Sequence, residues 1–92
     1  MRKLRWTPAA ATDLQAISDY LRKHHPHYRQ PTVRRLYERI RALKNAPYLN
    51  RPGSIAGTRE LLFLPLPYVA VYRVTADSVE ILRVYHTARQ RP

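Results

Sequence analysis

Three side chains toward the C-terminus have the types that could act on a phosphodiester: Arg59, Arg83 and His86. An arginine can stabilise the charge of a phosphorane, and a histidine can move a proton near neutral pH. Together they would suit RNA cleavage by attack of a 2′-hydroxyl. That chemistry also needs a second acid–base group. The nearest candidates are the tyrosines Tyr72 and Tyr85, whose ordinary pKa is about 10.

A structural role is the competing interpretation of the same residues. Arg83 alternates with Val79, Ile81 and Tyr85, so its side chain can lie beside core residues and hydrogen-bond the C-terminal tail. Under this interpretation Arg83 and His86 stabilise the fold and take no part in catalysis. At the level of the sequence both interpretations stay open.

The sequence carries no motif for a metal or a cofactor. His24, His25 and His27 crowd one predicted helix end, but adjacent histidines diverge, and no cysteine or nearby carboxylate completes a ligand set. No serine lies in a glycine-flanked elbow, and Gly53 and Gly57 do not make a phosphate-binding loop. We therefore expect neither a metal nor a cofactor.

The net charge indicates an anionic partner. The chain has 17 Lys and Arg against 6 Asp and Glu, a formal net charge of +11, and 14 of the cations are arginines. The planar arginine fork matches phosphate and carboxylate, so an acidic protein and a nucleic acid backbone both fit. A GC-rich genome would also favour arginine over lysine, but it does not account for the net charge.

Length and composition limit the class of protein. A chain of 92 residues predicts a single domain, residues 1–92, and a hydrophobic share of 45% is too high for a disordered tail. The absence of cysteine excludes a disulfide scaffold. No apolar run reaches the ~20 residues of a membrane span, and the basic N-terminus lacks the apolar stretch of a signal peptide. We expect a cytoplasmic protein with no membrane partner.

The first half of the chain predicts a strand and two helices. Residues 3–7 alternate as a short strand, and Thr7 followed by Pro8 is a helix-start signal. Apolar residues recur at steps of four, three and four from Ala10 to Leu21, which predicts a helix that ends before Pro26. A second helix is predicted to begin near Gln30–Pro31 and to end at residues 45–47.

The second predicted helix has a basic face opposite its apolar stripe. This face carries Arg34, Arg35, Arg39 and Arg41, and Glu38 is placed to pair with Arg34 and Arg41. A solvated surface with ordinary ion pairs is one interpretation, and a surface that binds an acidic partner is the other.

The second half of the chain predicts a loop at residues 48–57 and strands at 59–64, 68–74 and 79–85. A symmetric hairpin closed by the turn at 75–78 places Arg73 opposite Glu80. The predicted order is β-α-α-β-β-β. The fold class is therefore α+β, with a helical hairpin packed on a mostly antiparallel sheet in two layers.

These residues together resemble the RelE/ParE superfamily of toxins from bacterial type II toxin–antitoxin modules, and the ParE-like branch in particular. The resemblance covers nearly the whole chain and depends on the order and spacing of its motifs. They are Trp6, Ala10, Asp13-Leu14, Ile17 and Tyr20; Pro47-Tyr48; Gly57 to Leu61; Pro67 to Val69 and Val71 to Val74; Val79 to Val84; and His86, Ala88-Arg89 and Pro92. In such tails an aromatic residue often precedes the final proline, where this chain has Arg91.

The resemblance implies a small basic toxin neutralised by a cognate antitoxin, whose acidic segment would match the charge of +11. ParE-like members inhibit DNA gyrase, and RelE-like members cleave mRNA on the ribosome. Residues 48–60 hold Arg51 and Arg59 but no lysine, which favours the ParE-like activity over the RelE-like one. Other nucleolytic relatives use a histidine at about the place of His86, and ParE-like chains also have a tail like that from His86 to Arg89, so His86 does not discriminate between the two activities. Operator DNA would be bound only through the antitoxin complex.

Three hypotheses follow from the resemblance. The first is a ParE-like toxin that blocks gyrase by binding, without chemistry of its own. The second is a ribonuclease that uses Arg59, Arg83 and His86, and the third is an inactive relative that only binds its antitoxin. In each case we expect the antitoxin across the helix pair and an uncovered sheet edge, contacting Arg34, Arg35, Arg39 and Arg41.

Overall fold

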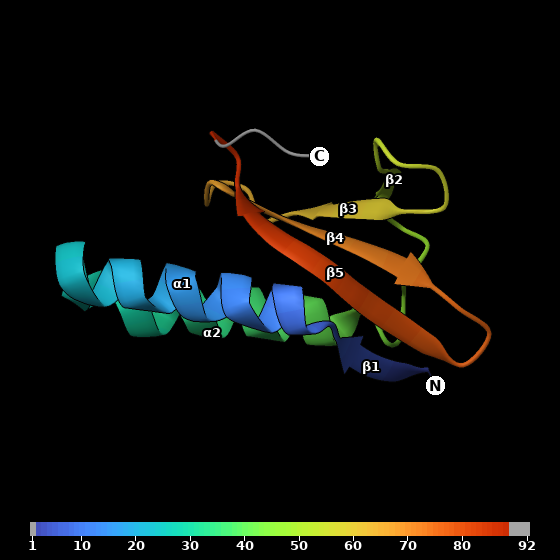
Figure 1. Ribbon diagram of the computed structural model, residues 1–92, viewed down its shortest axis with the longest axis horizontal. Coiled ribbons are helices and arrows are strands. Elements are labelled where there is room, and N and C mark those ends of the chain that lie inside the picture. The colour runs from blue at the N-terminus through green and yellow to red at the C-terminus, as the bar shows by residue number, and fades with distance from the viewer. Residues whose placement is uncertain (1, 89–92) are drawn as a thin grey trace.

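The computed structural model describes residues 2–88 and shows two helices packed on one face of a five-stranded sheet (Figure 1). The sheet order is β1-β5-β4-β3-β2. The strands are β1 (Lys3–Trp6), β2 (Arg51–Pro52), β3 (Arg59–Leu62), β4 (Tyr68–Val74) and β5 (Ser78–His86), and the helices are α1 (Pro8–His24) and α2 (Pro26–Ala42). Only the β1–β5 pair is parallel within the described sheet, so the predicted α+β class with a mostly antiparallel sheet is confirmed.

Helix α1 forms as its sequence signals predict. The Thr7 hydroxyl accepts a hydrogen bond from the Ala10 N–H at 3.1 Å, and Pro8 occupies the first turn, where a missing N–H costs nothing. The helix buries Ala10, Ile17 and Leu21 against the sheet. Thr7 also donates its hydroxyl to the Leu82 carbonyl at 2.9 Å, which fixes the start of α1 to β5.

The predicted start of the second helix is wrong by about one turn. Helix α2 begins at Pro26 rather than near Gln30–Pro31, and Pro31 lies inside it. Residues 27–30 are polar and mostly exposed, so they show no apolar period that would have revealed a helix. Two prolines can each mark a first helical turn, and in this chain the earlier one does.

The strands of the second half follow their predicted positions with small shifts. The predicted loop 48–57 contains the short strand β2, and β3 ends at Leu62, two residues early, because a turn containing Pro65 and Pro67 follows. Strand β4 has its predicted bounds. Arg73 lies opposite Glu80, as predicted, and their side chains form an ion pair at 2.6 Å.

An irregularity between β4 and β5 changes which side chains face the core. Tyr72 pairs with Ile81, but Val71 pairs with Arg83, so Leu82 is an extra residue in β5. Because side chains alternate along a strand, the bulge moves Val84 rather than Arg83 into the core with Val79 and Ile81. The expectation that Arg83 lies on the same face as Val79 and Ile81 is therefore wrong.

The hydrophobic core lies between the sheet and the two helices. It joins Leu36 and Ile40 of α2 to Leu61, Tyr72 and Ile81 of the sheet. Neither α1 nor α2 combines the length and the apolar character that a membrane crossing would require.

Candidate functional site

Arg83 is held by a carboxylate of α1. Its Nε donates to Asp13 Oδ2 at 2.7 Å and its Nη2 donates to Asp13 Oδ1 at 3.0 Å, while the Val84 N–H donates to the same Oδ2 at 2.9 Å. Strand β1 covers β5 only as far as Ile81, so α1 supplies the acceptor for the strand edge beyond it. The bonds to Asp13 raise the pKa of the Arg83 guanidinium. Its partner is thus Asp13, in place of the expected C-terminal tail.

A row of four side chains, three of them charged, crosses the sheet on the face away from the helices. The pairing register places Arg51, Glu60, Val71 and Arg83 side by side on neighbouring strands. Arg51 donates from Nε to the buried Glu60 Oε1 at 3.1 Å, and its Nη2 forms an ion pair with the same oxygen at 2.9 Å. The Arg83 guanidinium lies 5.0 Å from the centre of the Tyr85 ring.

Glu60, Val71 and Arg83 of this far-face row line a small cavity of about 70 Å³, together with Ser54, Thr58 and Tyr85 among others. Our sequence prediction missed Arg51 and Glu60. The alternation within residues 59–62 could have placed Glu60 beside Arg83, but only if the bulge in β5 had been anticipated.

Arg59 lies on the helix-facing side of the sheet and holds the preceding loop. It donates to the Asn50 carbonyl at 2.8 Å, and its guanidinium lies 5.2 Å from the Tyr48 ring centre. Tyr72, opposite Arg59, donates its hydroxyl to the Pro47 carbonyl at 2.6 Å. Burial raises the pKa of the Tyr72 phenol, which makes it a poorer proton shuttle near neutral pH.

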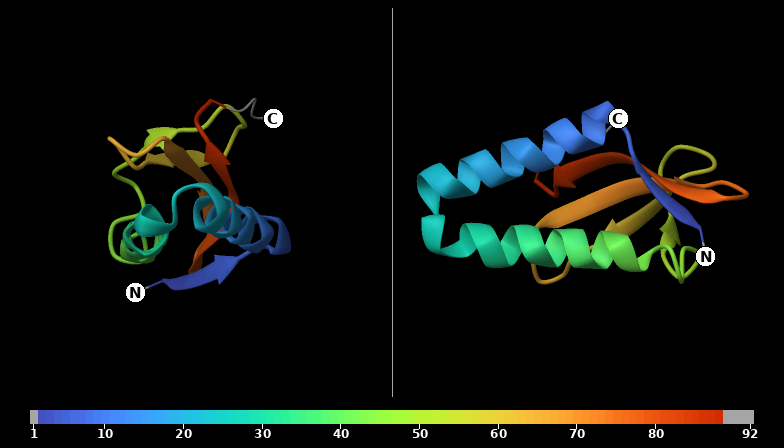
Figure 2. Two further views of the ribbon diagram at one scale, coloured as in Figure 1. Left: turned by 90° about the vertical axis from the view of Figure 1, so that its left-hand side faces the viewer. Right: turned by 90° about the horizontal axis from the view of Figure 1, so that it is seen from below.

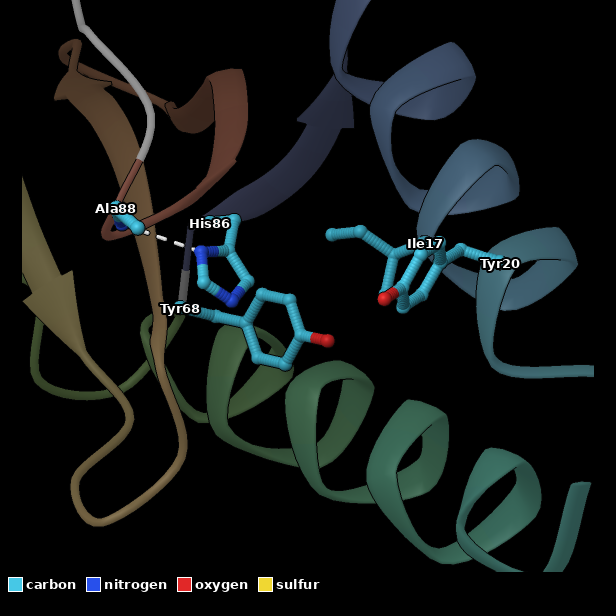
Figure 3. Close-up of a pocket in the computed structure, with 5 residues that line it drawn as sticks. All are labelled: Ile17, Tyr20, Tyr68, His86 and Ala88. Atoms are coloured by element: carbon cyan, nitrogen blue, oxygen red, sulfur yellow. Dashed lines mark hydrogen bonds between the residues drawn. The ribbon is translucent and has the colours of Figure 1, made fainter. Parts of the chain in front are cut away.

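His86 lies at the end of β5, on the helix-facing side, in a cavity of about 270 Å³ (Figure 3). Its ring meets the Tyr68 ring edge-on, with 5.5 Å between centroids. The Nδ1 atom accepts a hydrogen bond from the Ala88 N–H at 3.1 Å, so the neutral ring carries its proton on Nε2. Ile17 and Tyr20 of α1 complete the wall of the cavity.

The three residues expected to form a catalytic set do not meet. Arg83 lies on the far face, whereas Arg59 and His86 lie on the helix-facing side. Arg59 is opposite Tyr72 and His86 is opposite Tyr68, four residues apart on β4, a separation of about 13 Å. Arg89, the other tail candidate, lies outside the described residues.

The four arginines of α2 differ in their surroundings. Arg34, Arg35 and Arg41 are exposed. Arg39 instead donates to the Leu62 carbonyl at 2.9 Å and lies over the Phe63 ring, so it fastens α2 to the sheet. Glu38 forms no ion pair with any residue of the described chain, contrary to the pairing expected for it.

Arg41 contributes to a basic groove of about 490 Å³ between β1 and the end of α2. The groove is lined by Arg2, Lys3, Leu4, Trp6, Tyr37, Arg41 and Lys44. Trp6 and Tyr37 stack with ring centroids 6.2 Å apart, and both also line a groove of about 340 Å³ between the helices. Among residues 2–88 no carboxylate lines the basic groove, and Asp77 borders the adjoining cavity.

The carboxylates of the chain are mostly engaged elsewhere. Asp13, Asp19, Glu60 and Glu80, four of the six, each pair with an arginine outside the basic groove. These carboxylates therefore do not neutralise the positive charge of the groove, which can attract an anionic partner. Groups of three metal-binding side chains are absent from residues 2–88.

Known proteins match this chain over most of its length. The family model described as "ParE toxin of type II toxin-antitoxin system, parDE" matches residues 4–91. The chain is 38% identical to the protein Y4kP of Sinorhizobium fredii over 91 residues, 99% of this chain and 94% of that protein. It is 37% identical to the toxin RelE2 of Caulobacter vibrioides over 89 residues, 97% and 99% of the two chains.

Solved structures show the same fold. The chromosomal ParDE system of P. aeruginosa contains a chain with a TM-score of 0.85 and 30% identity, over 94% of this chain and 96% of that one. YafQ of E. coli gives a TM-score of 0.67 at 17% identity, over 96% of each chain, which is a likeness of fold.

Proposed function

We propose, from the premise that this chain belongs to the ParE toxin family of type II toxin–antitoxin systems, that it inhibits DNA gyrase by binding. The protein is a toxin of the RelE/ParE superfamily, and a cognate antitoxin is its partner. Both encounters would take place in the cytoplasm.

The observation that carries this proposal is the separation of the three side chains that the sequence predicts for catalysis. Arg59, Arg83 and His86 lie on two faces of the sheet, and Arg83 is bound to Asp13. A toxin that acts by binding does not require these groups to converge. The likeness to the P. aeruginosa ParDE chain further supports a ParE-like activity.

Neutralisation by the antitoxin would use the basic groove and the free edge of β1. Strand β1 ends the sheet, and its outer edge can accept another strand through main-chain hydrogen bonds. Carboxylates of an acidic antitoxin segment would meet Lys3, Arg41 and Lys44, and apolar side chains would pack on Trp6 and Tyr37.

The exposed Arg34 and Arg35 would extend the contact with the antitoxin along α2, whereas Arg39 would contribute least because it is bonded to β3. Operator DNA would be bound through the antitoxin of this complex. A toxin–antitoxin complex whose affinity does not fall at high salt would argue against an electrostatic contribution from these arginines.

Plasmid supercoiling by purified gyrase tests the proposed target. Added toxin should prevent supercoiling or trap linear plasmid, and addition of the antitoxin should restore supercoiling. Glu60→Gln, if it folds, should inhibit gyrase as well as the parent chain, since no carboxylate acts as a base under this proposal. Normal supercoiling at a saturating concentration of folded toxin would refute gyrase as the target.

One observation favours RNA cleavage as a second candidate function. The far-face row pairs a buried carboxylate, Glu60, with Arg51, and Glu60 lines one small cavity together with Arg83 and Tyr85. A carboxylate can accept the 2′-hydroxyl proton, and the arginines can stabilise the phosphorane. The toxin RelE2 of C. vibrioides is also among the relatives.

Translating ribosomes test this second candidate. Cleaved mRNA that disappears with Glu60→Gln would favour the far-face row, and cleavage that disappears with His86→Ala would favour the set expected from the sequence. An inactive relative would inhibit neither gyrase nor translation while still binding the antitoxin.

A further inference from the structure

The helical hairpin extends beyond the sheet and ends in a tip that the core does not use. Figure 2 shows both helices continuing past the end of the strands. Burial on the helices stops at Leu21 and resumes at Thr32, and no residue between them, all of which are described, is buried. The tip thus presents about one turn of α1 and nearly two turns of α2 for contact with a partner.

Aromatic and imidazole rings line this tip in succession. The Tyr20 ring lies 4.5 Å from the His24 ring and 6.3 Å from the His25 ring, and His25 lies 6.4 Å from Tyr28. Tyr20 is 51% exposed and Tyr28 is 66% exposed. Exposed tyrosines that are held in place by neighbouring rings are typical of residues that dominate protein interfaces.

Tyr20 also joins the tip to the His86 cavity. The cavity of about 270 Å³ has an apolar wall, Ile17, and an aromatic wall, Tyr68 with His86. The hydroxyl groups of Tyr20 and Tyr68 point toward each other across its opening (Figure 3). Its size and lining suit one apolar or aromatic side chain, which the Nε2–H of His86 or a phenol could hydrogen-bond.

The charge around the cavity and tip is positive. From Tyr20 to Thr32 the sequence contains Arg22, Lys23 and Arg29 and no carboxylate. The nearest carboxylate, Asp19, is paired with Arg22 at 2.9 Å. A partner that fits this surface therefore carries acidic residues around an apolar or aromatic side chain.

We propose that this tip surface, made of Ile17, Tyr20, His24, Tyr28, Tyr68 and His86, is where the toxin contacts gyrase. The inference rests on the proposed function and assigns that function a contact surface. The cavity accepts one apolar or aromatic side chain of the target, and the exposed Lys23 of the tip meets carboxylates of the target. The basic groove proposed for the antitoxin lies at the opposite end of the hairpin, by Trp6, Arg41 and Lys44, so the two partners use different surfaces.

A protein fits this surface better than a nucleic acid. One cavity takes one side chain, whereas a single strand needs successive stacking platforms along a continuous basic track. The cations of the tip lie on separate helices, with Arg22 and Lys23 on α1 and Arg29 on α2, and they do not form such a track.

The double variant Tyr20→Ala with Tyr28→Ala tests the assignment. Gyrase inhibition should need at least about tenfold more toxin, as expected when interface tyrosines are removed. Antitoxin affinity and melting temperature should stay at the parent values, because both rings are exposed and alanine suits a helix. Leu49→Ala, at an 85% exposed leucine far along the chain, is the matched control and should inhibit normally.

A charge reversal, Lys23→Glu, gives an independent test that leaves the aromatic rings in place. It should also weaken inhibition, and the loss should shrink at high salt. Tyr20→Phe, which keeps the ring, should retain most of the inhibition.

Each contrary result overturns the assignment in a different way. If the parent toxin inhibits gyrase and both tip variants inhibit equally well, the tip is not the contact surface and the proposed function stands. If the parent toxin does not inhibit gyrase, both proposals fail. If the tip variants lose antitoxin affinity instead, the surface belongs to the antitoxin. If they lose only mRNA cleavage, it belongs to an RNA substrate.

Discussion

Replacing Asp13 by alanine should destabilise the protein far more than removal of an ordinary surface carboxylate. Asp13 receives two hydrogen bonds from the Arg83 guanidinium and one from the Val84 N–H. Its side chain is only 15% exposed, whereas that of Arg83 is 43% exposed. The substitution would leave the Val84 N–H at the strand edge without a protein acceptor.

The size of the effect follows from these contacts. A hydrogen bond that involves a charged group contributes about 1.5–3 kcal/mol, and an unsatisfied buried N–H costs about 1–3 kcal/mol. Solvent around the partly exposed Arg83 weakens the ionic part, so the sum is well below the additive maximum. We expect a loss of about 3 kcal/mol in the free energy of unfolding. For a chain of 92 residues this lowers the melting temperature by roughly 12–24 °C.

Thermal and urea unfolding would measure this loss, and two further variants would identify its source. Asp13→Asn keeps an acceptor for the Val84 N–H and should recover about 1 kcal/mol of the loss. Asp19→Ala is the matched control, because Asp19 forms an exposed ion pair with Arg22. It should cost less than about 1 kcal/mol.

A double-mutant cycle of Asp13→Ala with Arg83→Leu would test the reasoning directly. A coupling energy of about 1–2 kcal/mol is expected for two residues in contact. A melting temperature for Asp13→Ala within about 3 °C of the parent value, or a coupling energy near zero, would refute the view that this pair fastens α1 to β5.

Three further predictions follow from other contacts. Because burial raises the folded-state pKa of Tyr72, the stability contributed by its protonated phenol is complete below pH 10 and falls as the pH rises above 10. Melting temperatures measured from pH 8 to 11 should show this decline, and a flat profile would contradict it. Arg39→Ala should lower the free energy of unfolding by about 1–2 kcal/mol through its lost bond to β3, whereas Arg34→Ala should change it by less than about 0.5 kcal/mol in the same urea titration. Lys3→Glu combined with Arg41→Glu should weaken antitoxin binding at least about tenfold at low salt, and calorimetry that finds an unchanged affinity would exclude the basic groove as the antitoxin site.

The local parts of the fold were predictable from the sequence because local interactions specify them. The Thr7–Pro8 start signal and the apolar periodicity that follows it predict both ends of α1 to within one helical turn. The turn at residues 75–78 sets the hairpin register that brings Arg73 to Glu80. The start of helix α2 was not predictable in this way, because residues 27–30 bury no side chain and so show no apolar periodicity.

The candidate site depended on tertiary structure at every step. The extra residue Leu82 turns Arg83 to the far face, although nothing in the spacing of β5 reveals the bulge. Asp13 reaches Arg83 across 70 residues because β1 is too short to cover the edge of β5. The sequence by itself determined the elements, the net charge and the types of side chain available. Which of those side chains meet was decided only by strand order, register and the packing of α1 on an open edge, since these bring together residues far apart in the chain.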